Sequence, residues 1–226
     1  MRFLHPESSL MQFLGKVADL MLLNVLLLLC SLPVVTAGAA LTATCKVTQD
    51  MVLQDDHGIV KRFFFTFRHE FRQSTGLWLL LLLAIGILAY DAFLVYLYCE
   101  GGFATTLYVF LGFFGFLVTA VAIYAFSLLA RYENRLKNHL RNACLLLIGK
   151  IHRTIPAVLL AILPVAVPLF FAVFFIKFIY LWIFLAFACS IYGISYLLKP
   201  VLLLNEQSKL IQESSVDMYN ETTDHE

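Results

Sequence analysis

The chain has 226 residues, a length that would ordinarily suggest one or two soluble domains. Hydrophobic residues make up 61% of it and charged residues 14%, against roughly 45–50% and about 25% in a typical soluble domain. These figures exclude intrinsic disorder and a small disulfide scaffold, and they weigh strongly against a soluble globule. The near balance of 16 Lys and Arg against 15 Asp and Glu argues against a nucleic-acid binder. We therefore expect lipid to be the solvent for most of the chain.

Five segments are apolar and long enough for membrane helices, since one span needs about 20 mostly apolar residues. We expect spans at about residues 17–35, 77–98, 103–130, 155–176 and 178–198. A tight turn near Lys177 would separate the last two spans. The sequence thus predicts an all-α polytopic membrane protein with one membrane domain over residues 1–204. A flexible, polar cytoplasmic tail would follow at 205–226.

The basic residues are unevenly distributed among the segments that connect the spans. Eleven Lys and Arg residues fall in the two long segments, 46–72 and 131–153, whereas Lys177 is the one basic residue in the other two loops. Because short cytoplasmic loops are enriched in Lys and Arg, we expect both long segments to be cytoplasmic. This orientation predicts an N-terminus outside the cell and a C-terminus in the cytoplasm.

Two alternatives concern the first span. Residues 10–29 followed by Ala37-Gly38-Ala39 have some features of a cleavable signal peptide. Separately, residues 36–53 could continue as a helix after the break at Pro33. That helix is too polar to face lipid across a whole bilayer. If it re-enters among the other helices, the predicted side of the N-terminus is reversed.

Residues 58–73 predict an amphipathic helix. At about 100° per residue, one face carries Ile59, Val60, Phe63, Phe64, Phe67 and Phe71, and the other carries Lys61, Arg62, Arg68, His69 and Arg72. Phe65 and Glu70 are exceptions to this division. A basic face opposite a Phe-rich face is typical of a helix in the membrane interface. We expect Lys61, Arg62, Phe63, Phe67, Arg68, Phe71 and Arg72 to contact lipid or a partner protein.

A second cytoplasmic amphipathic helix is predicted around residues 131–147. Its apolar residues recur at helical spacing among basic ones and include Leu136, Leu140 and Leu147. Each basic segment leads into a predicted pair of spans, which suggests a weak parallel duplication around an added first span.

Three polar residues lie within the predicted spans. Asp91 lies toward the outer end of the second span and is a candidate site, because buried charge in a membrane is costly; a hydrogen-bonded structural carboxyl is the simpler interpretation. Asp19 and Asn24 are explained by polar contacts between helices. No catalytic motif, ligand-spaced His cluster or C-x-x-C pair is present, so we expect no enzyme activity, cofactor or metal.

The segment Leu32-Pro33-Val34-Val35-Thr36-Ala37-Gly38-Ala39, followed by Thr42-Ala43, resembles the YesL-type family of bacterial integral membrane proteins of unknown function. The resemblance continues through Phe63-Phe64, Phe67-Arg68 and Phe71-Arg72-Gln73, and covers about residues 1–200. Arg68 and Glu70 depart from the Lys and Asn more usual in that family. The resemblance implies a multi-span protein of the bacterial plasma membrane, often encoded beside carbohydrate ABC-transporter components.

These observations together lead to a functional hypothesis. We expect a non-enzymatic accessory protein that contacts subunits of a carbohydrate ABC transporter and assists its assembly, activity or regulation. The alternative is a small stand-alone transporter or channel that uses Asp91.

Overall fold

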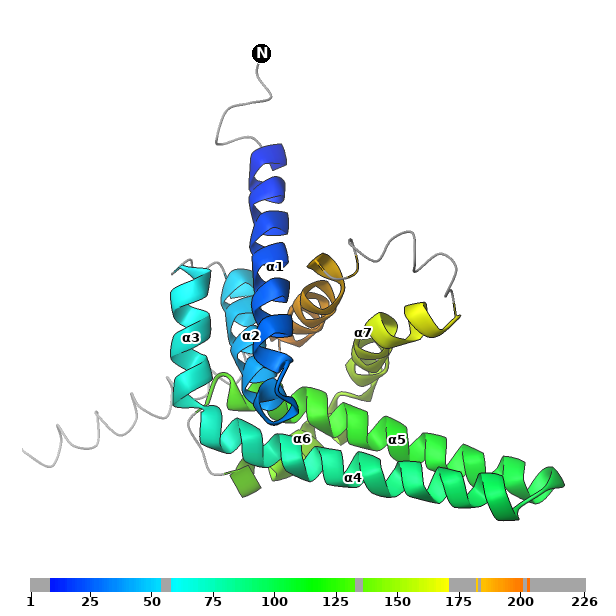
Figure 1. The fold of residues 1–226 in the computed structure, drawn as a ribbon. Helices are drawn as coiled ribbons and strands as arrows, with labels where there is room; N and C mark the ends of the chain where they lie inside the picture. The colour runs from blue at the N-terminus through cyan, green and yellow to red at the C-terminus, as the bar shows by residue number, and fades with distance from the viewer. Residues whose placement is uncertain are drawn as a thin grey trace, which may run out of the picture.

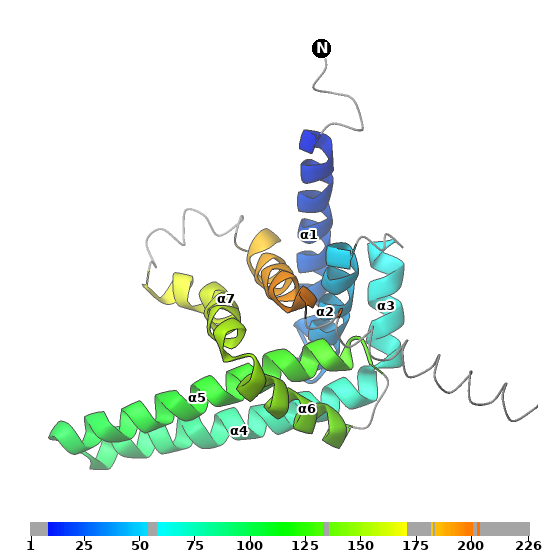
Figure 2. The ribbon, with the colours of Figure 1, turned by 180° about the vertical axis from the view of Figure 1, so that it is seen from behind.

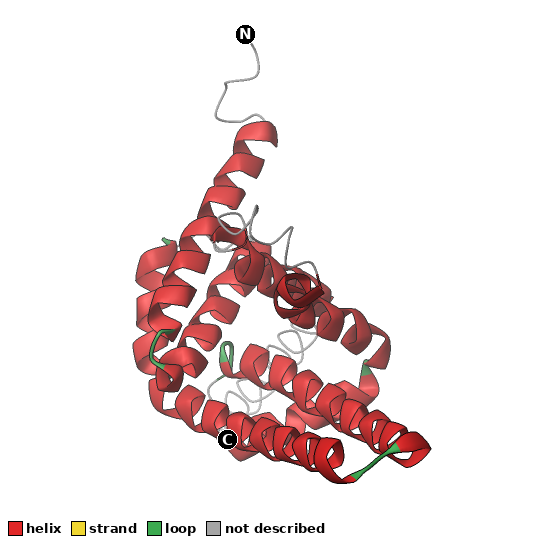
Figure 3. Cartoon of the chain, turned by 45° about the vertical axis from the view of Figure 1, so that its right-hand side comes forward, coloured by secondary structure: helices red, strands yellow, loops and turns green. Residues whose placement is uncertain are grey.

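The structure is a computed structural model that describes residues 9–53, 58–132, 136–170, 182, 184–200 and 203. Within these residues every regular element is a helix (Figure 3), which confirms the predicted all-α class. The helices are α1 (Ser9–Ser31), the short 3-10 helix η1 (Val34–Thr36), α2 (Ala37–Leu53), α3 (Ile59–His69), α4 (Phe71–Tyr98), α5 (Gly101–Leu129), α6 (Leu136–Gly149) and α7 (Ile151–Phe170). A last helix covers Phe184–Pro200.

Four described helices are long and apolar enough to cross a membrane: Phe13–Ser31, Phe71–Tyr98, Gly101–Leu129 and Ile151–Pro168. They overlap the first four predicted spans. The shorter apolar helix Phe184–Pro200 overlaps the fifth. The predicted turn at Lys177 and the predicted tail at 205–226 lie outside the described residues. Large apolar side chains are exposed along α4 and α5, for example Phe93 at 56% and Phe110 at 59%, as expected for helices that face lipid.

The first two helices form a hairpin (Figure 1). α1 ends at Ser31 because Pro33 has no backbone N–H and disfavours helical geometry in the residue before it. The Thr36 hydroxyl donates to the Cys30 carbonyl at 2.6 Å, which satisfies one of the last carbonyls of α1. α2 then runs back alongside α1, and Leu20, Leu23 and Leu27 of α1 belong to the same core cluster as Ala40, Ala43, Val47 and Met51 of α2. Residues 36–53 are therefore buried among helices, as the re-entrant alternative requires.

A close approach at Gly38 brings α2 against α4. A Cβ atom at this position would lie 2.5 Å from the Trp78 Cβ and 2.7 Å from the Ser74 carbonyl oxygen. The Trp78 indole donates to the Val34 carbonyl at 2.7 Å, and the Ser74 hydroxyl donates to the Thr42 hydroxyl oxygen at 2.8 Å. The small residue thus allows two helices to meet at van der Waals distance and to bond through polar groups.

The amphipathic helix predicted over residues 58–73 is shorter than expected. α3 ends at His69, and Phe71 and Arg72 belong to α4. Glu70, at φ −91° and ψ 5°, changes the chain direction, although Glu70 N–H still bonds the Thr66 carbonyl and Ser74 N–H bonds the Glu70 carbonyl. One residue outside the helical range of ψ is enough to turn α3 into a separate element beside α2.

The remaining helices pack on this framework. α4 and α5 form a long hairpin that extends to one side of the molecule (Figures 1 and 2), closed by Gly101 at φ 68°, a conformation that favours glycine. α6 buries His139, Ala143 and Leu147 against the core, which confirms a helix in the second basic segment. Figure 2 shows α7 and the Phe184–Pro200 helix on the far side of α1 and α2 from α3.

Candidate functional site

A group of buried polar side chains lies on α2, in the interior of the molecule. Five polar residues of α2 are at most 4% exposed: Thr42, Thr44, Thr48, Gln49 and Asp50. The hydroxyls of the three threonines bond carbonyls one turn earlier in the helix. Gln49 also donates to the Ser127 carbonyl of α5 at 3.0 Å, and the Thr48 hydroxyl lies 2.9 Å from that of Ser195. Hydrogen bonds therefore join α2 to α5 and to the Phe184–Pro200 helix.

Asp50 is surrounded by basic side chains from three parts of the chain. Its side chain is 5% exposed, and the Arg62 Nε lies 2.5 Å from its Oδ2. The Lys46 Nζ lies 3.7 Å and the Arg131 Nη1 3.9 Å from its Oδ1. Lys46 is one turn earlier on α2, Arg62 is on α3, and Arg131 follows α5. We refer to these four residues as the Asp50 cluster.

The Asp50 cluster has a clear electrostatic role. Taking a carboxylate out of water costs several kcal/mol unless opposite charges and hydrogen bonds compensate for the lost hydration. Here the compensating charges come from separate elements, and their side chains are only 12–22% exposed. The attraction is therefore poorly screened by water. It holds α3 and the end of α5 against the C-terminal part of α2.

Two further cations lie at the same end of the molecule. The Lys199 Nζ donates to the Val52 carbonyl at 3.3 Å, two residues after Asp50. The Arg153 Nη1 donates to the Leu197 carbonyl at 3.2 Å, two residues before Lys199. These bonds join α7 and the Phe184–Pro200 helix to the Asp50 cluster. The structure thus brings together basic residues from both long segments that the sequence places on one side of the membrane.

The seven residues predicted to contact lipid or a partner differ in how far they are exposed. Lys61, Arg68, Phe71 and Arg72 are exposed, and Phe67 is half-buried. Phe63 is fully buried, with its ring stacked on that of Phe67 at a centroid distance of 6.1 Å. Arg62 belongs to the Asp50 cluster. Phe63 and Arg62 therefore lie on the side of α3 that faces the core, Phe63 in an apolar cluster and Arg62 beside the Asp50 carboxylate.

The outer surface of α3 is formed by Phe64, Phe65, Arg68 and His69, which line a shallow pocket. Phe64 is 44% exposed and Phe65 69% exposed. The Phe65 and His69 rings stack at 5.8 Å, and the His69 Nδ1 lies 2.8 Å from the Glu70 Oε1. Phe65, an exception to the sequence pattern, is therefore part of an organised aromatic and basic surface.

The three polar residues predicted within the membrane also differ in burial and in hydrogen bonding. Asn24 is fully buried, and its Oδ1 accepts a hydrogen bond from the Ala188 N–H at 2.7 Å, a polar contact between helices of the kind expected. Asp19 is half-buried on α1. Asp91 is exposed on α4 and has no hydrogen bond or ion pair to any described residue.

Sequence reasoning missed Asp50 as a site residue. The available signal was the pair Lys46 and Asp50, four residues apart on a helix whose other residues, apart from Gln49, are small, apolar or hydroxyl-bearing. Such spacing usually indicates a surface ion pair. The two arginines that complete the cluster are 12 and 81 positions further along the chain, so their approach depends on the tertiary fold.

The chemistry available to these residues is limited. Within the described ranges, no group of three His, Cys, Asp or Glu side chains could hold a metal ion. Cys45, on α2, is only 9% exposed, so its thiol is shielded from reagents in water. The Asp50 cluster positions helices, while the outer surface of α3 offers groups that can bind a partner.

The fold and the distribution of apolar surface define a polytopic α-helical membrane protein with a buried ionic cluster around Asp50. Residues 20–92 match a protein family of unknown function, DUF624. The matched segment runs from α1 to α4 and includes Lys46, Asp50 and Arg62. No curated protein and no solved structure matches the chain.

Proposed function

We propose that the chain is a non-enzymatic accessory protein of the bacterial plasma membrane that associates with a carbohydrate ABC transporter. The observation that supports it best is the construction of α3. Its inner side is fixed by Phe63 and by the Arg62–Asp50 pair, so its outer surface is held rigidly. A surface that is ordered before binding loses less entropy when a partner docks.

The composition of the α3 outer surface suits a protein partner with acidic groups. Exposed aromatic and Arg residues are enriched at protein interfaces, and here Phe64, Phe65 and Arg68 lie within one helical turn or so of each other. The choice of a carbohydrate transporter as the partner rests on the resemblance of residues 32–43 and 63–73 to YesL-type proteins.

The proposed orientation places the basic end, formed by Lys46, Arg62, Arg131, Arg153 and Lys199, in the cytoplasm. Loop counting alone puts the N-terminus outside. The α1–α2 hairpin favours the re-entrant alternative instead, because α2 returns alongside α1 toward the basic end. Both termini would then be cytoplasmic. Fluorescent or phosphatase reporters fused to each terminus distinguish the two arrangements.

The association is tested by purification from the native host in mild detergent, with bound proteins identified by mass spectrometry. We expect the permease and ATPase subunits of a carbohydrate transporter to be retained. The triple variant F64A/F65A/R68Q should lose them while keeping its helical circular dichroism. The matched control F93A/F110A/K137Q removes two exposed aromatics and one exposed cation elsewhere and should retain them. Equal retention by both variants, or a partner-free protein, contradicts the proposal.

The stand-alone transporter or channel has weaker support. Asp91, its candidate residue, is exposed on the α4–α5 hairpin without a described polar partner. That hypothesis requires solute flux into proteoliposomes that contain this chain alone, reduced by Asp91→Asn.

A further inference from the structure

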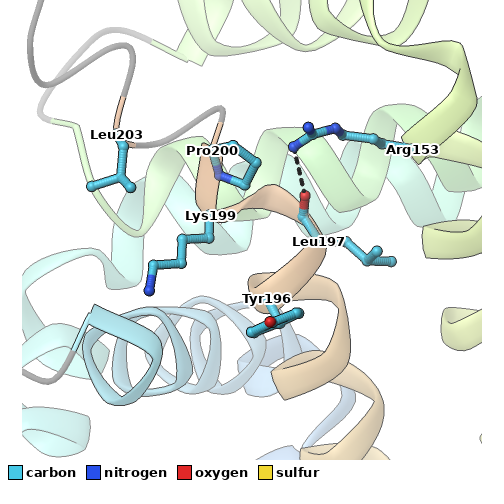
Figure 4. A pocket seen from close by; sticks show the side chains of 6 residues that line it. All are labelled: Arg153, Tyr196, Leu197, Lys199, Pro200 and Leu203. Carbon is cyan, nitrogen blue, oxygen red and sulfur yellow. Dashed lines mark hydrogen bonds between the residues drawn. The ribbon is translucent and has the colours of Figure 1, made fainter.

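A pocket of about 490 Å³ lies at the basic end, away from the α3 outer surface. Its lining residues are Arg153, Tyr196, Leu197, Lys199, Pro200 and Leu203. Figure 4 shows Arg153 reaching in from α7, with Pro200 between it and Lys199 in this view. The pocket therefore combines two cations, a phenol and an apolar wall.

Both cations keep hydrogen-bond donors available. The Arg153 Nη1 bonds the Leu197 carbonyl at 3.2 Å and its Nε bonds the His152 Nε2 at 3.3 Å, while the Lys199 Nζ bonds the Val52 carbonyl at 3.3 Å. A guanidinium has five N–H donors and an ammonium three, so these bonds leave several unused. No carboxylate of the described residues pairs with either cation. The pocket thus carries positive charge that an anion can neutralise.

The depth of the pocket in the membrane follows from the helices that form it. Arg153 is in the first turn of α7, whose residues 151–168 are a candidate span. Lys199 is the last residue but one of the apolar helix Phe184–Pro200. One helix begins and the other ends at the pocket, so both cations lie where apolar helices meet water. This is the level of lipid headgroups, and basic pockets between helices at this level suit lipid phosphates.

We propose that this pocket binds the phosphate of an anionic phospholipid. Arg153 and Lys199 would donate to the phosphate oxygens, and Leu197, Pro200 and Leu203 would contact the glycerol and the first acyl carbons. Tyr196, 64% exposed, adds an aromatic edge of the kind found at membrane interfaces. Free phosphate would satisfy the two cations but would leave the apolar wall exposed to water, which is why we assign the lipid.

The proposal is tested by native mass spectrometry of the full chain in neutral detergent, titrated with phosphatidylglycerol or phosphatidylcholine. We expect tighter binding of phosphatidylglycerol and a loss of roughly 10- to 30-fold in its affinity in R153Q/K199Q. The control variant K137Q/R141Q removes the same charge from exposed positions of α6 and should bind like the unmodified chain. Equal binding of the two lipids, or unchanged affinity in R153Q/K199Q, overturns the proposal.

A second variant covers the case in which R153Q/K199Q does not fold. Tyr196→Glu places a negative charge in the pocket at an exposed position, so it should fold normally and repel the lipid phosphate. Inorganic phosphate at millimolar concentration forms the last arm. We expect it not to displace the lipid; displacement, or intact lipid binding by the Tyr196→Glu variant, overturns the lipid assignment.

Discussion

The Asp50 cluster provides the most direct test of the structure through the substitution Asp50→Asn. The two side chains have nearly the same shape, so the change removes charge and leaves packing intact. Arg62, Lys46 and Arg131 then remain beside an uncharged amide. Breaking a fully buried ion pair by removing one partner costs about 3–5 kcal/mol.

The expected magnitude here is smaller, because the three cations are 12–22% exposed and water can partly hydrate them. We therefore expect Asp50→Asn to lower the free energy of unfolding by about 2–3 kcal/mol. For a chain of this length, about 2–4 °C of Tm corresponds to each kcal/mol, which gives a fall of roughly 5–10 °C. The measurement is thermal unfolding in detergent, followed by circular dichroism.

Asp91→Asn is the matched control, since it makes the same chemical change at an exposed carboxylate without a described partner. We expect it to change stability by no more than about 0.5 kcal/mol. A double-mutant cycle of Asp50→Asn with Arg62→Gln should show coupling of about 1–2 kcal/mol, because the two residues share one interaction. Equal melting temperatures for the Asp50→Asn and Asp91→Asn variants, or strictly additive effects in the cycle, would refute the proposed role of Asp50.

Three other substitutions or reactions test separate contacts. Gly38→Ala should lower the free energy of unfolding by about 1–3 kcal/mol, because the added Cβ would lie 2.5 Å from the Trp78 Cβ. Gly112→Ala should cost far less, because no atom lies within 4 Å of the added Cβ. Melting curves of the two variants in detergent test the difference. Asn24→Ala should cost about 1–3 kcal/mol because it removes the buried hydrogen bond between the Ala188 N–H and the Asn24 Oδ1, and the exposed Asn142→Ala is its control in the same melting assay. Maleimide at pH 7 should label exposed Cys144 in the native protein but reach Cys45 only after denaturation, because burial blocks access to the Cys45 thiol. Peptide mass mapping locates the label, and native labelling of Cys45 would contradict the core position of α2.

The fold class follows from the sequence because it depends on composition and local period. Long apolar runs such as residues 77–98 specify helices wherever the solvent is lipid, since only internal hydrogen bonds can then satisfy the backbone. α5 therefore lies close to the predicted span, and α4 covers the whole of its predicted span but begins earlier, at Phe71. The break after α1 is also local, because Pro33 is visible in the sequence and the Thr36 hydroxyl completes it.

The side of α3 that faces the core could not be predicted in this way. The helical pattern of apolar residues assigns every arginine to the outward face, so it predicts Arg62 on the same face as Lys61 and Arg68. In the structure Arg62 turns inward because Asp50, on another helix, is buried beside it. A period calculated along one helix contains no information about a charge on its neighbour. The predicted apolar face therefore included Phe64, which is 44% exposed, and left out Arg62, which faces the core.

The same reasoning connects the ionic cluster to the function proposed for α3. An 11-residue helix is marginal in isolation, so its order depends on what holds its inner side. Phe63 supplies apolar contact and Arg62 supplies an ion pair, and both come from the stretch that also presents Phe64 and Phe65. The Asp50→Asn variant should therefore weaken partner retention even though Asp50 lies away from the α3 outer surface. The variant F64A/F65A/R68Q should abolish retention of the partner subunits. It should lower the free energy of unfolding by no more than about 1 kcal/mol, because its three substitutions are at exposed positions. If the Asp50→Asn variant retains partners fully at a temperature where it is folded, the buried pair stabilises the protein but does not order its binding surface.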